Sequence, residues 1–421
     1  MVEKLVSDMR LSSIVPGKIT GENKTYELKG IDLAMKLHYI NALYFFNNTN
    51  IINATSIEPE INNNSNSNNN GCKRILMSVD EMKAAPMYDW LISYFMTCGR
   101  IRVSSEETGD RPSIKLNDAG IRMIEAHSIK TVDEWLAMED FLGLQDHLVY
   151  NHALGPDLPF SPLVCLQHPK TLSLQDPLQK PNHQPSSPAQ EPMSVKRVNP
   201  VGNHWVIPTN CKIGTHTFHL TSKQLDELRS KVYGSNNISD DVTGQSFELI
   251  TAILWRSIAK VRKDLGTKYV TICKPKTINR QKEIPYNGQV LGTIEANFPV
   301  SSANPLKLVH KIAGDVVDES DMIEELVNKE SSNFDYIVYG TNLTFVDMEN
   351  ADVYGFKLKG NSPAFVSYTI GGVQDRGAIL VLPGPNKVKD EDNKGKLIVL
   401  HLPEIEIEFL KSELKKEWSI T

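Results

Sequence analysis

The composition of the chain changes sharply near its middle, and the change divides the sequence into two stretches of domain size. Between residues 168 and 200 the chain holds seven prolines and few aliphatic residues. Such a segment favours an extended conformation and cannot supply a hydrophobic core. The sequence therefore predicts an N-terminal domain at residues 1–167, an inter-domain linker at 168–204 and a C-terminal domain at 205–421.

The bulk composition is that of a globular protein with two cores. The 421 residues are 40% hydrophobic and 23% charged, which is ordinary for such a chain. A net charge of −6 disfavours nucleic acid and anionic membrane surfaces as primary partners. No apolar run approaches the ~20 residues of a membrane helix, so we expect no transmembrane segment. Five cysteines without a Cys-x-x-Cys pair indicate free thiols in a reducing compartment.

Local patterns predict several elements in the N-terminal half. The alternation at Lys36–Phe46 predicts a strand, and the helical spacing of aromatic residues in Asp89–Thr97 predicts a helix. Residues Ser113–Ala126 favour two short strands around a turn. A capping box at Thr131-x-x-Glu134 predicts a helix through Phe141. The asparagine-rich tract of residues 62–70 indicates a disordered surface loop.

The C-terminal half predicts both helices and strands. Thr221-x-x-Gln224 is a capping box that opens one helix, and the apolar stripe of residues 247–261 predicts a second. Trp255 belongs to that stripe, which favours a position in the hydrophobic core. The alternative is a position on the wall of a ligand-binding channel. A last helix is expected at Glu404–Trp418. Strands are expected at Tyr269–Cys273, Tyr336–Val346, Ala364–Ile370, Gly377–Leu382 and Lys396–Leu402.

Eight sequence blocks, in order along nearly the whole chain, point to a known family. They are Leu11–Pro16, Gly30–Tyr39, Ala42–Phe46, Cys98–Arg102, Lys115–Gly120, Leu154–Val164, Leu249–Trp255 and Asn342–Val346. Together they resemble the BAHD superfamily of plant acyl-CoA-dependent acyltransferases, and they are most similar to its eceriferum branch.

The resemblance implies an α/β fold of two similar sheet-plus-helix domains, of the BAHD and chloramphenicol-acetyltransferase type. Substrate and coenzyme A would enter a channel between these domains, so acyl-CoA is the implied ligand. The eceriferum branch implies support of very-long-chain fatty acid elongation for cuticular wax. The implied partner is an elongase condensing enzyme. The implied location is the cytoplasmic side of the endoplasmic reticulum, or the cytoplasm.

The catalytic motif of the family is missing. BAHD catalysis depends on His-x-x-x-Asp, which should follow Leu163–Gln167, but here Gln167 leads directly into His168-Pro169. None of the eleven histidines is followed four residues later by aspartate. A general base needs an accessible imidazole with a pKa near neutrality. We therefore assign no catalytic residue and expect an incomplete N-terminal domain, which should be the less stable of the two.

Three further patterns bear on this interpretation. His152-Ala-Leu-Gly-Pro-Asp157 looks like the motif with one extra residue, but it precedes Phe160–Val164, whereas the catalytic box follows that strand. The Asp-Phe-Gly-Trp-Gly signature is absent, and Asp352–Pro363 stands in its place. The Tyr-Phe-Gly-Asn block is replaced by Tyr286–Gln289, which leaves the residues that bind coenzyme A unassigned.

No metal site is expected. His216 and His219 lie three residues apart in an alternating stretch, so their side chains should point to opposite faces of a strand. The mixed charges of residues 387–396 favour a solvated loop.

Two explanations of the gap after Gln167 stay open. The sequence comes from a skipped exon or faulty gene model, or it is a genuine variant that keeps only a binding role. Three functions follow: a non-catalytic accessory of the elongase, an acyl-CoA-dependent transferase whose sequence lacks its base, or a non-functional truncated product. Whether the chain is an enzyme therefore stays open at this point.

Overall fold

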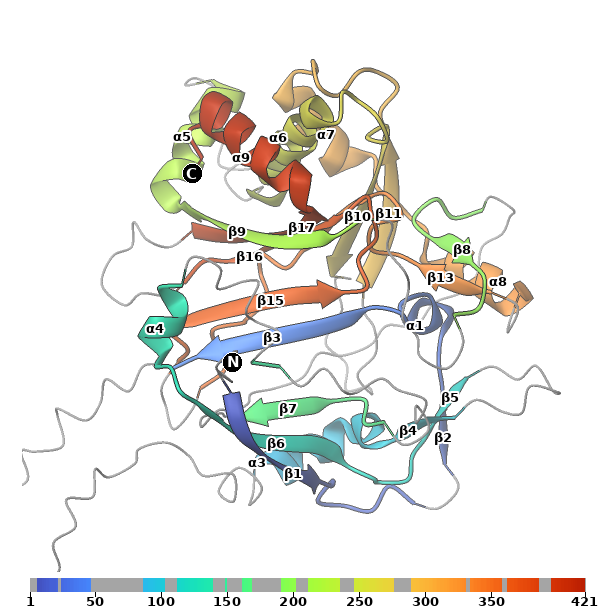
Figure 1. The fold of residues 1–421 in the computed structure, drawn as a ribbon. Coiled ribbons are helices and arrows are strands. Elements are labelled where there is room, and N and C mark those ends of the chain that lie inside the picture. Colours follow the sequence, from blue (N-terminus) through green and yellow to red (C-terminus); the bar gives the residue numbers. More distant parts are fainter. Residues whose placement is uncertain are drawn as a thin grey trace, which may run out of the picture.

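The protein is arranged in layers, with a large helix-covered sheet, a two-stranded ribbon below it and a smaller sheet at the far side (Figure 1). The computed structural model describes residues 6–21, 24–46, 86–102, 112–138, 148–149, 161–168, 191–201, 211–234, 246–275, 289–330, 334–357, 362–385 and 395–420.

The large sheet has seven strands and lies wholly in the C-terminal half. The pairs β10–β14 and β14–β16 are parallel, and the other pairs are antiparallel. In spatial order the strands are β12 (Val317–Asp318), β11 (Gln289–Glu295), β10 (Tyr269–Pro275), β14 (Leu343–Asp347), β16 (Ala378–Pro383), β17 (Gly395–Pro403) and β9 (Ile213–Thr221).

Four helices cover one face of this sheet and enclose the main hydrophobic core (Figure 1). Trp255 is 0% exposed there, and its indole N–H donates to the carbonyl of Thr267 at 2.8 Å, which confirms its predicted core position. The capping box at Thr221 and Gln224 is also confirmed. The helices are α5 (Ser222–Tyr233), α6 (Ser246–Val261), α7 (Pro305–Gly314) and α9 (Glu404–Trp418).

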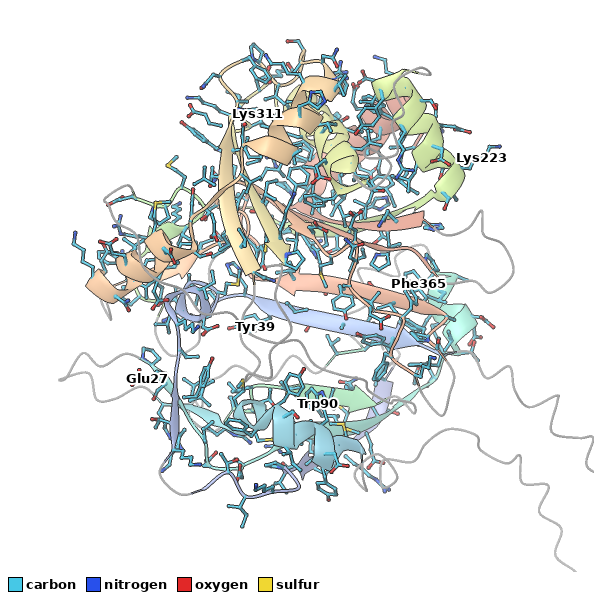
Figure 2. All side chains as sticks on the ribbon, turned by 180° about the vertical axis from the view of Figure 1, so that it is seen from behind. Glu27, Tyr39, Trp90, Lys223, Lys311 and Phe365 are labelled. Carbon is cyan, nitrogen blue, oxygen red and sulfur yellow. The ribbon has the colours of Figure 1, made fainter. Side chains whose placement is uncertain are left out.

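A segment from the N-terminal half packs on the opposite face. Strand β3 (Tyr39–Phe45) pairs antiparallel with β15 (Phe365–Gly371) over seven residues, from Tyr39↔Gly371 to Phe45↔Phe365. Figure 2 shows Tyr39 and Phe365 at opposite ends of this ribbon. The preceding helix α1 (Gly30–Ala34) packs against α8 (Ser320–Glu330).

Polar contacts hold this N-terminal segment, residues 29–46, in place. The Gly30 N–H donates to the Glu324 carboxylate, and Lys36 pairs with Asp335. Only glycine fits at position 30, because a Cβ there would lie 2.7 Å from the Glu324 Cα. We name residues 29–46 the strap, since they tie the two halves together.

Part of the expected linker packs against the C-terminal half. Ser194 is 0% exposed and donates its N–H and hydroxyl to Glu319 Oε2, at 2.8 and 2.6 Å. Strand β8 (Lys196–Val198) then pairs with β13 (Asp335–Ile337). The division at 1–167, 168–204 and 205–421 stays a prediction, but two strand pairings cross it.

The strand expected at Tyr336–Val346 is in fact two. It divides into β13 and β14, which belong to different sheets. The break lies at Gly340, whose φ is +87° and whose added Cβ would lie 2.5 Å from the backbone of Gln374. A residue with a side chain could not make this turn, so the glycine ends the first strand.

The N-terminal half forms the smaller layer. A three-stranded sheet, in the order β1 (Val6–Ile14), β6 (Ile121–Ser128) and β7 (Cys165–His168), packs against α3 (Pro86–Ser93) and the short η2 (Phe95–Cys98). Trp90, labelled in Figure 2, stacks on Tyr94 at 4.5 Å between ring centroids. A second small sheet has the order β2 (Thr25–Glu27), β5 (Ser113–Lys115) and β4 (Arg100–Arg102).

These elements confirm the predicted helix near residues 89–97 and the two strands around residues 117–120. The capping box at Thr131 and Glu134 is also present, but its helix α4 (Val132–Leu136) ends before the predicted Phe141. The asparagine-rich tract and residues 387–394 lie outside the described residues.

No helix in the described ranges is long and apolar enough to cross a membrane. The four cysteines within those ranges are free thiols.

Candidate functional site

The candidate site is the face of β6 and β7 that turns toward β3. Gln167 stands opposite Ile124 in the parallel pairing of these strands, so the two side chains share one face. Ala126, two residues further along β6, packs with Phe45 of β3. Leu166, on the opposite face, packs with the α3 core. Figure 1 shows β7 as the strand of the small sheet that is nearest to β3.

The Gln167 amide is the most unusual polar group on this face. Its Nε2 and Oε1 atoms are both buried, and neither has a hydrogen-bond partner within the described part of the chain. Leaving a buried polar atom without a partner costs about 1–3 kcal/mol. A neutral amide can donate and accept at once, so this group is suited to bind a ligand that offers both.

Arg122 adds a positive charge to the same face. It stands opposite Cys165, two positions before the Ile124–Gln167 pair. Burial raises the pKa of the Cys165 thiol, while the guanidinium groups of Arg122 and Arg100 oppose that rise. No carboxylate of the described ranges forms an ion pair with Arg122. The face therefore combines a cation with a neutral amide.

β6 contains His127 and β7 ends at His168, but both side chains lie outside the described part of the chain. The five histidines whose side chains are described lie on or beside other elements. His38 precedes β3, His216 and His219 lie on β9, His310 on α7 and His401 on β17. The rejected alternative, His152, lies outside the described residues. The other histidine side chains outside them are those of His127, His147, His168, His183 and His204.

His38 connects the strap to the C-terminal half. Its Nε2 accepts the backbone N–H groups of Val338 and Tyr339, at 3.0 and 3.3 Å, so the imidazole is neutral with its proton on Nδ1. Burial lowers the pKa of His38 to about 4, against the opposing effect of the backbone at Gly371 and Gly372. A ring whose basic nitrogen already accepts two hydrogen bonds cannot serve as a general base near neutrality.

His401 has a similar structural environment. It is 2% exposed, its Nε2 accepts the Ile370 N–H at 3.2 Å, and its Nδ1 lies 3.1 Å from the Thr215 hydroxyl. Burial lowers the pKa of His401 to about 4. The ring thus joins strands β17, β9 and β15.

The His216–His219 stretch forms part of β9, as the alternation predicted. The His216 ring packs edge-on against Phe218 at 4.7 Å between centroids, on the side of β9 that faces the core. His219 is three residues away and therefore points to the opposite side. No group of three metal-ligating side chains comes together within the described ranges.

The blocks that carry the family resemblance have structural roles. The Arg100 guanidinium donates to the carbonyl groups of Gly99 and Gly120, at 2.8 and 2.9 Å, and so joins Cys98–Arg102 to Lys115–Gly120. The Asn342 amide donates to the Met193 carbonyl at 2.9 Å and to the Thr271 hydroxyl at 3.1 Å.

Two stretches of the chain, Tyr286–Gln289 and Asp352–Pro363, differ from the signatures of the family, and the structure describes only part of each. Of Tyr286–Gln289, Gln289 is described, and its Oε1 accepts the Cys273 thiol at 3.2 Å and the Tyr339 hydroxyl at 3.3 Å. In the region that begins at Asp352, Tyr354 and Phe356 are buried. These residues support the fold.

Gln167 and Arg122 were not predicted as site residues from the sequence. The available signal was weak: Gln167 follows the apolar run Leu163–Leu166, and Arg122 lies between the apolar residues Ile121 and Met123. That their side chains share a face depends on the pairing of β6 with β7, which no local pattern reveals.

Comparison with known proteins identifies relatives along the whole chain. The chain is 32% identical to Protein ECERIFERUM 26-like of Arabidopsis thaliana, over 99% of this chain and 97% of that protein. It is 29% identical to Protein ECERIFERUM 2 of the same plant, over 97% of this chain and 98% of that protein. No family model matches the chain.

Solved structures share the fold at low sequence identity. Vinorine synthase matches with a TM-score of 0.58 and 13% identity, over 97% of this chain and 98% of that chain. The TRI101 protein of F. graminearum, in complex with coenzyme A and deoxynivalenol, matches with a TM-score of 0.58 and 11% identity, over 94% of this chain and 98% of that chain. The expected α/β fold of the two-domain BAHD acyltransferases is thereby confirmed.

Proposed function

This chain belongs to the ECERIFERUM family, and from that membership we propose that it supports very-long-chain fatty acid elongation for cuticular wax without acyl transfer of its own. The observation that carries the second part is the absence of any histidine with aspartate four residues later. The neutral, hydrogen-bonded rings of His38 and His401 support it, because neither has a basic nitrogen free for proton abstraction.

The proposed ligand is acyl-CoA, and the proposed location of its binding site is the space between the two halves. The solved TRI101 structure, which has the same fold, is a complex with coenzyme A. The proposal is supported by Arg122 and Gln167, which supply a cation and a neutral amide on one face of β6 and β7. Binding without transfer would let the protein hold an acyl-CoA close to the enzyme that extends it.

The proposed partner is an elongase condensing enzyme on the cytoplasmic side of the endoplasmic reticulum. Co-expression of the chain with a wax condensing enzyme in a heterologous host should lengthen the fatty acids formed, as measured by chain-length profiling. A second variant, tested in parallel, would carry a His-x-x-x-Asp segment inserted after Gln167. If only the variant with the insertion lengthens the fatty acids, the present sequence is a broken product. If neither does, the elongation role is wrong.

The alternative is an acyl-CoA-dependent transferase whose sequence lacks its catalytic exon. It is favoured by the direct step from Gln167 to His168-Pro169 at the point where the motif belongs. Genomic sequence between the two codons distinguishes these cases, because an in-frame segment that encodes His-x-x-x-Asp would identify a skipped exon.

We expect the purified chain to show no acyl transfer. Loss of a general base typically lowers the rate by ~10²–10⁴, and here the segment that should carry the base is missing as well. The assay incubates the protein with long-chain acyl-CoA and a panel of alcohols and amines, and it measures free coenzyme A. Turnover that disappears in the variant His152→Ala would show that this histidine is catalytic after all.

A further inference from the structure

We propose that Gln167 and Arg122 together recognise the coenzyme A part of the ligand, with the Gln167 amide bound to an amide of the pantetheine arm and Arg122 bound to a phosphate. This inference rests on the proposed function, because it takes acyl-CoA as the ligand. It goes further in naming the two side chains and in separating recognition of the coenzyme from recognition of the acyl chain.

The Gln167 amide lacks the hydrogen bonds that a buried amide normally makes. Both of its polar atoms are buried and without partners in the described chain, although leucine would fill a similar volume without that loss. Gln289, a glutamine of the C-terminal half, accepts hydrogen bonds from Cys273 and Tyr339. A glutamine that weakens the fold is explained if a ligand completes its hydrogen bonds.

The two side chains also match coenzyme A in chemistry and spacing. The arm of coenzyme A carries two amides, each with one donor and one acceptor, and it ends in phosphates. Arg122 lies two residues along β6 from the position opposite Gln167, which corresponds to roughly 6–7 Å along a strand. An extended ligand lying along β6 could therefore meet both side chains. A free fatty acid has neither an amide nor a phosphate.

The thiol of Cys165 gives this face no covalent role. Burial raises the pKa of the Cys165 thiol, which therefore stays protonated near neutrality. An attack on the thioester would need the thiolate. The face is thus equipped to bind an acyl-CoA and not to cleave it.

The test combines stability and binding in the full-length chain. The variant Gln167→Leu should melt about 1–3 °C higher than the wild type, because an unpaired amide is removed. Its dissociation constant for stearoyl-CoA should rise about tenfold, equivalent to about 1.4 kcal/mol, while that for stearic acid stays the same. The variant Arg122→Gln should weaken stearoyl-CoA binding and reduce its dependence on salt.

The matched control is Gln289→Leu, which should lower the melting temperature because Cys273 and Tyr339 lose their acceptor. The inference is overturned if Gln167→Leu melts lower than the wild type, or if it binds stearoyl-CoA equally well. A wild type that lengthens fatty acids but binds no stearoyl-CoA also overturns it, while the elongation role stands. A wild type that binds with the expected losses in both variants but lengthens nothing removes the elongation role alone.

Discussion

Lowering the pH from 7 to 4.5 is expected to remove roughly 5 kcal/mol from the free energy of unfolding, because two histidines must stay uncharged in the fold. His38 and His401 each have a folded pKa of about 4 against an ordinary value of 6.5. Below pH 6.5 the unfolded chain binds protons at these positions and the folded chain does not. Stability is therefore fully present above pH 6.5 and declines as the pH falls towards 4.

Urea unfolding at several pH values measures this effect. The variants His38→Gln and His401→Gln should each be less stable at pH 7 but should each lose about half of the pH dependence between 6.5 and 4.5. A slope that is the same in the double variant and the wild type would show that other groups cause the acid sensitivity.

The variant Glu406→Ala is expected to cost about 3–5 kcal/mol, because it leaves a buried guanidinium unpaired. Arg262 is 8% exposed, and its Nε and Nη2 atoms donate to both Glu406 oxygens at 2.7–3.1 Å. The pair attaches α9 to the end of α6. Thermal unfolding of the full chain measures the loss.

The first turn of α9 supplies a matched control. Glu404 pairs with Lys212, but their side chains are 50% and 81% exposed, so Glu404→Ala should cost about 0–1 kcal/mol. The double variant Arg262→Met with Glu406→Leu should recover much of the lost stability, since it removes both charges. Equal losses for Glu404→Ala and Glu406→Ala would contradict the importance of burial.

Elements with strong local signals could be predicted from the sequence. Both capping boxes form as expected, and the last helix runs from Glu404 to Trp418 as predicted. These cases succeed because capping and helical spacing act between residues a few positions apart. The α7 helix was missed, although Asn304 caps it and Pro305 begins it.

Features that depend on distant residues could not be predicted in this way. The split at Gly340 requires the backbone of Gln374 to pass close by, and the pairing of β3 with β15 joins the two halves of the chain. The candidate site could not be predicted for the same reason. Gln167 and Arg122 become neighbours only when β7 pairs in parallel with β6.

The strap has a consequence for the order in which the protein folds during its synthesis. Tyr44 leaves the ribosome early, yet its hydroxyl contacts that of Tyr368, 324 residues later in the sequence. At ~5–20 residues per second, the partner strand is made roughly 16–65 s afterwards. Throughout that interval β3 is without its partner, so chaperones have a long period in which to bind it. The pairing of β3 with β15 can therefore form only after most of the chain has been synthesised.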